Sequence, residues 1–341
     1  MFWYAFSSLT PAVFLALACL WGGIWPAVSV VLVTALVFFM DRIVVKQTPK
    51  GGTSGGAALM WVLGGVHCLL WALGIWAIAA NPVLDGGDRI VLCAGLGLYF
   101  GQVSNSNAHE LIHRAARAPR RLGIVIYGSL LFAHHASAHL RVHHVWAGTA
   151  QDPSTARLGE GFWRYLPRAW FGAVMAGKRA EDRLRRARGT LFWSHPYTGY
   201  TALSLAAIAF AALIAGWRGV FVLLVIAAYA QIQLYLSDYV QHYGLLRRIH
   251  SDGKPVPIGP ERSWNAPQWY SSAMMLNASL HSDHHGNPAR AFPDLSVARG
   301  RMPMLPHSLP VMATIALVPW LWRWMMDKRA LRWRDPAGGA V

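Results

Sequence analysis

The chain has 341 residues, of which 55% are hydrophobic and only 13% are charged. Soluble domains carry about 25% charged residues, so this composition excludes an ordinary soluble domain and predicts a membrane protein. The net charge of +16 comes without the aromatic-interleaved basic motif of a nucleic-acid-binding module, so we expect no nucleic-acid partner.

Six apolar segments are long enough to cross a bilayer, which needs roughly 20 apolar residues in a helix. They cover about residues 3–22, 25–41, 57–80, 89–108, 198–215 and 219–241. The first segment lacks a preceding basic stretch and a cleavage signal, so we interpret it as a retained spanning helix. A turn from Gly216 to Gly219 separates the last two segments. The fold class predicted is therefore all-α, a polytopic membrane protein with six transmembrane helices.

Basic residues gather in the loops that six spans would place on one side of the membrane. The loop 41–56 carries Lys46 and Lys50, and the segments 114–196 and 243–341 are rich in arginine. Cytoplasmic loops carry an excess of Lys and Arg, so we expect both termini and both large segments in the cytoplasm. The whole chain is then expected to be one multi-pass domain in a bacterial-type inner (cytoplasmic) membrane. A cap of helices would lie on its cytoplasmic side.

Two further apolar stretches are not expected to span the membrane. Residues 122–133 are too few to cross a bilayer, and we expect them to pack against the spanning helices or to lie in the interface. The Trp-rich tail 308–326 favours an interfacial or partly buried helix over a seventh span.

Nine histidines form four clusters near the ends of apolar segments. They are His109, His113, His139, His143, His144, His242, His281, His284 and His285. Residues three or four apart share a helix face, so each cluster is expected to aim its rings at one point. All four clusters fall on the cytoplasmic side of the predicted topology. Neutral imidazole is a common ligand of iron, zinc and copper, and nine ligands predict two ions rather than one.

Two other metal-dependent interpretations of these histidines remain open. The run from His109 to His113 matches the H-E-x-x-H signature of zinc metalloproteases, in which Glu110 would be the general base. A protease needs about three protein ligands, so it does not need the seven clustered histidines that lie outside this run. A metal transporter would need polar residues along a path through the spans, whereas the polar groups here gather at one end.

Several polar residues near the clusters are expected to support the ligands in a second shell. The carboxylates are Glu110, Asp152, Asp238 and Asp283. Ligating histidines usually donate their second N–H to a carboxylate or a carbonyl, which is the role predicted for these four. Glu110 or Asp283 could instead bridge the ions, as in soluble carboxylate di-iron bundles. His134 is expected to support the ligating rings or to line a pocket without binding metal itself. His135 shares a helix face with His139 and is a possible tenth ligand.

The stretches around these clusters resemble the membrane-bound alkane 1-monooxygenases, in the alkane and xylene hydroxylase branch of the membrane fatty acid desaturase and hydroxylase superfamily. The matching runs are 107–114, 139–145, 151–157, 238–247 and 280–288. The resemblance covers about residues 100 to 295. Ala138 and Gln241 stand where that family commonly has Glu, and Ser279 with Leu280 replaces its Gln-Arg pair.

This resemblance implies an O2-dependent monooxygenase with two non-haem iron ions held by the nine histidines and no catalytic residue beyond the ligands. It would hydroxylate the terminal carbon of an n-alkane or an alkyl chain, and this substrate would enter from the surrounding membrane lipid. Its electrons would come from a rubredoxin or ferredoxin and the associated reductase, because no C-x-x-C pair for a fused rubredoxin is present. The alternatives are a membrane fatty-acid desaturase or hydroxylase and a xylene-type methyl hydroxylase.

Aromatic residues of the spans could set how deeply an alkyl chain enters a channel between the helices. The candidates are Phe38, Phe39, Trp61 and Trp71. Packing in the helix bundle is an equally good interpretation of each of them.

Overall fold

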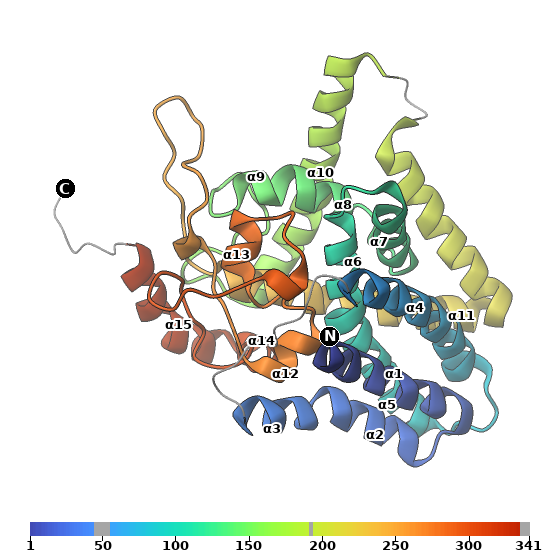
Figure 1. The fold of residues 1–341 in the computed structure, drawn as a ribbon. Coiled ribbons are helices and arrows are strands. Elements are labelled where there is room, and N and C mark those ends of the chain that lie inside the picture. Colours follow the sequence, from blue (N-terminus) through green and yellow to red (C-terminus); the bar gives the residue numbers. More distant parts are fainter. Residues whose placement is uncertain (44–54, 191–193, 335–341) are drawn as a thin grey trace.

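The computed structural model describes residues 1–43, 55–190 and 194–334 (Figure 1). These residues form helices joined by loops, with isolated β-bridges and no strand, so the all-α prediction is confirmed for them. The predicted loop residues Lys46 and Lys50, and residues 335–341 of the predicted cap, lie outside the described residues.

The first three predicted spans correspond to well-defined helices. They are α1 (Phe2–Trp21), α2 (Ile24–Val33), α3 (Ala35–Ile43) and α4 (Gly56–Ala80). Gly22 and Gly23 turn the chain between α1 and α2 with φ of 59° and 62°, values that glycine adopts without steric cost. The second predicted span bends at Thr34, where α2 passes into α3.

The fourth predicted span is one helical run with a wider turn inside it. It consists of α5 (Gly86–Tyr99), the π-helix η2 (Phe100–Ser104) and α6 (Asn105–Ile112). Asp85 begins the run by accepting the backbone N–H of Asp88 at 2.7 Å. The N–H of Asn105 bonds the carbonyl of Phe100, five residues earlier, which defines the π turn.

The last two predicted spans are the two arms of α11 (Pro196–His242). A helix of 47 residues is about 70 Å long, more than twice the thickness of a hydrocarbon core. Its backbone is non-helical at Ala215 and Gly216, where the arms meet, close to the predicted turn. By length and composition, four helices of the described chain could cross a membrane: α1, Ile24–Ile43, α4 and α11.

Helices outside these candidate spans surround one end of the bundle. They are α7 (Arg117–Ser129), α10 (Phe162–Arg188), α12 (Trp269–Met274), α13 (His281–Gly286), α14 (Leu309–Ala316) and α15 (Pro319–Arg334), with short 3-10 turns at Pro260–Arg262 and Phe292–Asp294. The apolar stretch 122–133 begins in α7, which packs on α4, α6 and α11 as expected. The tail helix is partly buried, because Trp322 is enclosed whereas Trp320 and Trp324 are exposed.

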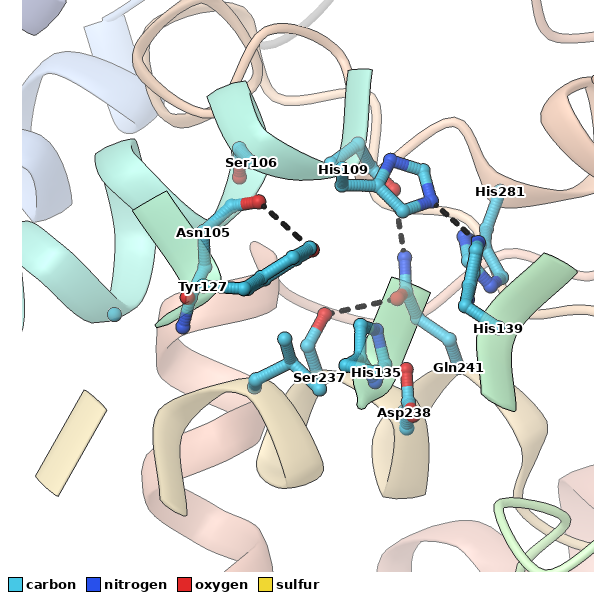
Figure 2. A pocket seen from close by; sticks show the side chains of 13 residues that line it. Asn105, Ser106, His109, Tyr127, His135, His139, Ser237, Asp238, Gln241 and His281 are labelled. Carbon is cyan, nitrogen blue, oxygen red and sulfur yellow. Dashed lines mark hydrogen bonds between the residues drawn. The ribbon is translucent and has the colours of Figure 1, made fainter. Parts of the chain in front are cut away.

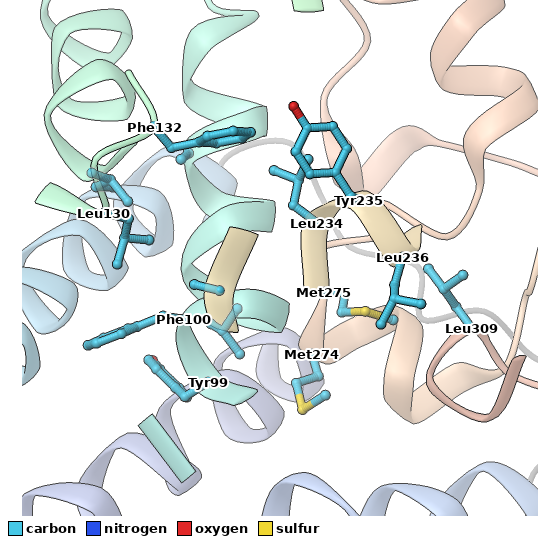
Figure 3. Close-up of a cluster of buried hydrophobic side chains, with 14 of the residues drawn as sticks. Tyr99, Phe100, Leu130, Phe132, Leu234, Tyr235, Leu236, Met274, Met275 and Leu309 are labelled. Atoms are coloured by element: carbon cyan, nitrogen blue, oxygen red, sulfur yellow. The ribbon is translucent and has the colours of Figure 1, made fainter. Parts of the chain in front are cut away.

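A buried apolar cluster joins several of these elements (Figure 3). It brings together Phe100 of η2, Phe132 after α7, Leu234 and Tyr235 of α11, and Met275 after α12. Much of this cluster belongs to predicted spans, where close van der Waals packing rather than removal from water holds helices together. The cluster therefore fixes the ends of the helices from which the histidines project.

Candidate metal centre

The nine clustered histidines converge in the structure as two groups. The first group is His109, His113, His139, His144 and His284, and the second group is His143, His242, His281 and His285. Within each group, one ring nitrogen per residue lies within 4.8 Å of all the others. Segments that are 140 residues apart in sequence therefore deliver donor atoms to the same point, as expected from the spacing.

Two of the four sequence clusters feed both groups instead of one. On α13, His281 and His285 are four residues apart and belong to the second group, whereas His284 belongs to the first. The cluster at His139 divides in the same way, because His143 joins the second group. The expectation that each cluster aims at one point is wrong for these two clusters.

A π turn explains how the second cluster divides. The segment runs from α8 (His135–Ala138) through the π-helix η3 (His139–His143) to α9 (His144–Trp146). The N–H of His144 bonds the carbonyl of His139, five residues earlier. In such a wide turn, residues five apart come onto a common face, and π turns occur often at functional sites. The Nε2 atoms of His139 and His144 accordingly lie 2.9 Å apart.

The spacing of the ring nitrogens fits a bound metal ion. The Nε2 of His139 lies 2.9 Å from that of His109, 2.9 Å from that of His144 and 3.1 Å from that of His113. A ring nitrogen has one proton or one lone pair, so it cannot hydrogen-bond three others. Neighbouring nitrogens that are each about 2.1 Å from a shared ion would be about 3 Å apart.

The second group shows the same convergence. The Nε2 of His281 lies 2.9 Å from that of His242 and 3.1 Å from that of His285. The Nε2 of His143 is buried and has no hydrogen-bond partner among the described residues, which leaves it available as a ligand. The chemistry of the donor set therefore fits a transition metal in both groups.

Burial keeps most of these rings in the neutral form that binds metals. The pKa values of His139, His144 and His284 are lowered well below the usual value, first by burial and then by neighbouring histidines. A neutral imidazole offers a lone pair without releasing a proton, so these rings are ready to coordinate an ion.

Asp152 distinguishes His143 from the other rings. Its Oδ2 lies 2.9 Å from Nδ1 of His143 and accepts the Thr155 hydroxyl at 2.8 Å. Burial, the largest single influence, favours neutral His143, but the charge and hydrogen bond of Asp152 together with the charge of Asp238 outweigh it and raise the pKa of His143. The same contact lowers the pKa of Asp152 in spite of its burial. The structure thus places one predicted carboxylate on the outer nitrogen of a candidate ligand.

Two other predicted carboxylates bind groups other than the clustered histidines. Glu110 forms an ion pair with Arg114 and accepts the backbone N–H of Phe292 at 3.0 Å. Asp283 pairs with Arg290 at 2.6 Å and accepts the N–H of Ser296 at 2.8 Å. Charge-assisted bonds to arginine are stronger than bonds to neutral imidazole, so these carboxylates hold the loops around the histidines.

The two remaining histidines of the region lie beside the groups rather than in them. The ring of His134 contacts Phe132 and Trp170, with centroids 4.7 and 6.0 Å apart. The ring of His135 stacks on Phe132, with its centroid 5.2 Å from that of His139, and belongs to neither group.

A pocket opens next to the first group, with an empty volume of about 440 Å³ that includes open solvent at its mouth (Figure 2). Its lining consists of Gly101, Asn105, Ser106, His109, Tyr127, His135, His139, Leu234, Ser237, Asp238, Gln241, Ala278 and His281. Asp238, the fourth predicted carboxylate, is in this wall, and its buried Oδ2 has no partner among the described residues. Rings of both groups therefore face one cavity.

The polar side chains of the pocket wall mostly bond one another or the backbone. Ser237 donates to Oε1 of Gln241 at 2.9 Å, and Gln241 donates to the carbonyl of Ala278 at 2.9 Å. Asn105 donates to the carbonyl of Ala230 at 2.9 Å. The contacts of Gln241 with Ala278 and of Asn105 with Ala230 are long-range, so no periodic pattern in the sequence could have identified these wall residues as a set.

The four aromatic channel candidates are not part of this lining. Phe39 and Trp61 face outward, with 59% and 48% of their surface exposed. Trp71 is buried and donates to the carbonyl of Ser129 at 3.0 Å, whereas Phe38 packs under the guanidinium of Arg42. A role in a channel remains a prediction for all four.

Comparison with known proteins places this arrangement in a family context. The fatty acid desaturase family model matches residues 89–316, which contain all nine histidines. Alkane 1-monooxygenase 1 of Pseudomonas aeruginosa is 30% identical over 266 residues, or 77% of this chain and 69% of that protein. An alkane 1-monooxygenase of Acinetobacter baylyi is 32% identical over 71% of this chain and 59% of its own length. Alkane 1-monooxygenase 2 of Pseudomonas aeruginosa is 27% identical over 89% and 84%.

Proposed function

We propose, since the chain belongs to the fatty acid desaturase family, that it is a membrane-bound alkane monooxygenase. It would use O2 and a di-iron centre to hydroxylate the terminal carbon of an n-alkane or an alkyl chain. The observation that carries the proposal is the convergence of nine imidazoles as two groups beside one pocket. The names of the three relatives described above, each an alkane 1-monooxygenase, support the same reaction.

The two histidine groups would hold one iron ion each. The first group would supply five imidazoles and the second group four. Iron bound in this way supplies the redox chemistry needed to reduce O2 and to attack an unactivated C–H bond. The imidazole-only donor set distinguishes this centre from carboxylate-bridged di-iron bundles.

The side chains of the chain itself prepare the centre for that chemistry. Asp152 would accept a hydrogen bond from the Nδ1–H of His143, which fixes the tautomer of the ring and leaves the Nε2 lone pair free to bind the ion. In the pocket wall, Ser237 and Gln241 use their hydrogen bonds on each other and on Ala278. A hydrocarbon can therefore enter without leaving Ser237 or Gln241 unpaired.

The same proposal includes a topology of six spans. The two arms of α11 on either side of Gly216, and the run from α5 to α6, would add to the three N-terminal spans. Both termini and the histidine groups would then face the cytoplasm, in a bacterial-type inner membrane. The substrate would reach the pocket directly from the bilayer, and a rubredoxin or ferredoxin with its reductase would supply electrons.

Product analysis tests the proposal. The purified full-length chain, reconstituted with iron and an electron source, should convert decane to 1-decanol with one oxygen atom derived from ¹⁸O2. The requirement for iron is checked by repeating the assay after chelation, which should abolish product. Label from water, or turnover without O2, would contradict a monooxygenase.

A fatty-acid desaturase is the second candidate, and the matching family model favours it. The two reactions differ in their products, because desaturation leaves no substrate-bound oxygen from O2. Incubation with a palmitoyl substrate should leave it saturated if the first proposal is correct. A new double bond in that substrate, without hydroxylation of decane, would favour desaturation.

A further inference from the structure

A second cavity lies outside the pocket and is lined by three arginines. Its walls are formed by Arg247, Arg248, Val256, Pro257 and Arg262, around an empty volume of about 470 Å³. These residues belong to the loop after α11, the light-orange hairpin that projects from the body in Figure 1. The reaction described above makes no use of this cavity.

The floor of this arginine cavity is bonded to the segment that carries the candidate ligands. The guanidinium of Arg247 donates to the carbonyl of Val145 at 3.2 Å, and Val145 directly follows His144. The backbone N–H of Arg247 bonds the carbonyl of Gly148 at 2.7 Å, in the turn after α9. Arg247 therefore links the cavity directly to the segment that carries His143 and His144.

The arginine cavity carries more positive charge than its own carboxylates neutralise. Arg262 pairs with Glu261 at 2.7 Å, but Arg247 and Arg248 have no carboxylate partner among the described residues. Arg247 is only 9% exposed, and its buried Nε lacks a partner there as well. Burial, together with the neighbouring Arg262, lowers the pKa of Arg247. An incoming anion would relieve this repulsion and pair with the exposed guanidinium of Arg248.

We propose that the arginine cavity is the docking point of an acidic, one-electron iron–sulfur carrier protein that reduces the metal centre. This inference rests on the proposed function, which needs a reductant. Guanidinium groups match carboxylates in bidentate geometry, and Val256 with Pro257 adds apolar contact at the rim. The reduced carrier protein gives up one electron each time it docks.

The electron balance requires two such dockings in each turnover. One alkane and one O2, with two electrons and two protons, give one alcohol and one water. Each carrier molecule leaves oxidised by one electron, and the protons come from solvent. The loop that lines the arginine cavity must therefore release the carrier quickly, which suits an exposed and mainly electrostatic contact.

The test uses charge reversal at the exposed arginine of the cavity and at a matched site. Arg248→Glu changes the net charge by two and leaves the buried contacts of Arg247 in place. Arg186→Glu, on the exposed end of α10, makes the same change in charge away from the cavity. Binding of an oxidised rubredoxin and of an oxidised [2Fe–2S] ferredoxin is titrated calorimetrically against each full-length protein in detergent.

The proposal predicts that at least one carrier binds the unmodified chain and the Arg186→Glu variant with similar affinity. For that carrier, Arg248→Glu should weaken binding about tenfold at low salt, and added salt should reduce the difference. Equal affinity of all three proteins, an equal loss for both variants, or no binding of either carrier to the unmodified chain would overturn it.

A chemical reductant separates this proposal from the proposed function. If each protein is first reduced with dithionite without O2, freed of excess reductant and then exposed to O2, Arg248→Glu should form as much 1-decanol in this single turnover as the unmodified chain, because the docking step is bypassed. If Arg248→Glu shows normal dithionite-driven turnover and unchanged carrier binding, the proposed docking site is wrong but the proposed function stands. The absence of 1-decanol from every protein would remove the function, whereas the binding titration would still decide whether the carrier uses this cavity.

Discussion

The two histidine groups are built from overlapping segments but differ in what surrounds them. His109 and His139 of the first group line the pocket, where the substrate would lie, whereas His281 is the one ring of the second group that does so. In the second group, His143 is the one ring of the nine with a hydrogen bond to a carboxylate among the described residues. The first group is therefore the one more exposed to substrate, and the second is held and electrically tuned by Asp152. Two groups built from the same imidazole donors can therefore have different roles in the same site.

The largest difference should come from removing a ring at the centre of the first group. His139→Ala deletes the nitrogen that lies within 3.1 Å of three others, so the first group should lose its ion. We expect no detectable hydroxylation, and iron content should fall by at least one ion per chain by elemental analysis. His134→Ala is the matched control, because His134 lies outside both groups, and it should keep its iron. Full iron loading of His139→Ala would contradict the ligand assignment.

Loss of the carboxylate should affect the second group selectively. Asp152→Asn keeps the shape of the side chain but removes the charge that holds His143. Loss of such a partner typically costs about 10- to 100-fold in metal affinity or activity. In a titration with a chelator, one iron ion should be released at a lower chelator concentration than in the unmodified chain. The other ion should be released at the same chelator concentration as in the unmodified chain. The exposed Asp252→Asn serves as the control, and simultaneous loss of both ions would show that the groups are not independent.

Acid should also separate the groups. The pKa of His143 is raised, so protonation competes with metal at this ring as the pH falls below the folded value. The pKa values of His139, His144 and His284 are lowered, so these rings stay neutral to a lower pH. Between pH 8 and pH 6, iron affinity should fall by up to about tenfold per pH unit in the second group only. The measurement is chelator competition at each pH, and equal weakening of both ions would refute the distinction.

The smallest effect should come from the pocket wall. Ser237→Ala removes the donor to Gln241, a loss of about 1 kcal/mol or roughly fivefold in an equilibrium. We expect a change of this size in the KM for decane with unchanged iron content. The exposed Thr190→Ala should change neither value. An altered iron content in Ser237→Ala would indicate that this bond supports the metal centre rather than the pocket.

Much of the architecture could be predicted from the sequence because its cause is local. Apolar length identified α1 and α4, and the glycines at positions 22, 23 and 216 mark real breaks in helical backbone. Helical spacing identified the histidines that converge. The predicted helix over 89–108 continues through a π turn, which no 3.6-residue period reveals.

The division of the histidines between the groups was not predictable in the same way. It depends on the bond from His144 to His139 and on the path of α13, both set by tertiary packing. The same holds for the carboxylates, since proximity in sequence suggested Asp283 whereas its charge is paired with Arg290. The pocket wall combines residues such as Asn105 and Gln241, which share no local pattern.

The central claim is that the two groups hold one iron ion each. Its most direct test is the metal content of the purified full-length chain, measured as moles of each metal per mole of protein by mass spectrometry. The account predicts two iron ions per chain and no stoichiometric zinc. A single ion per chain, or zinc in place of iron, would contradict it.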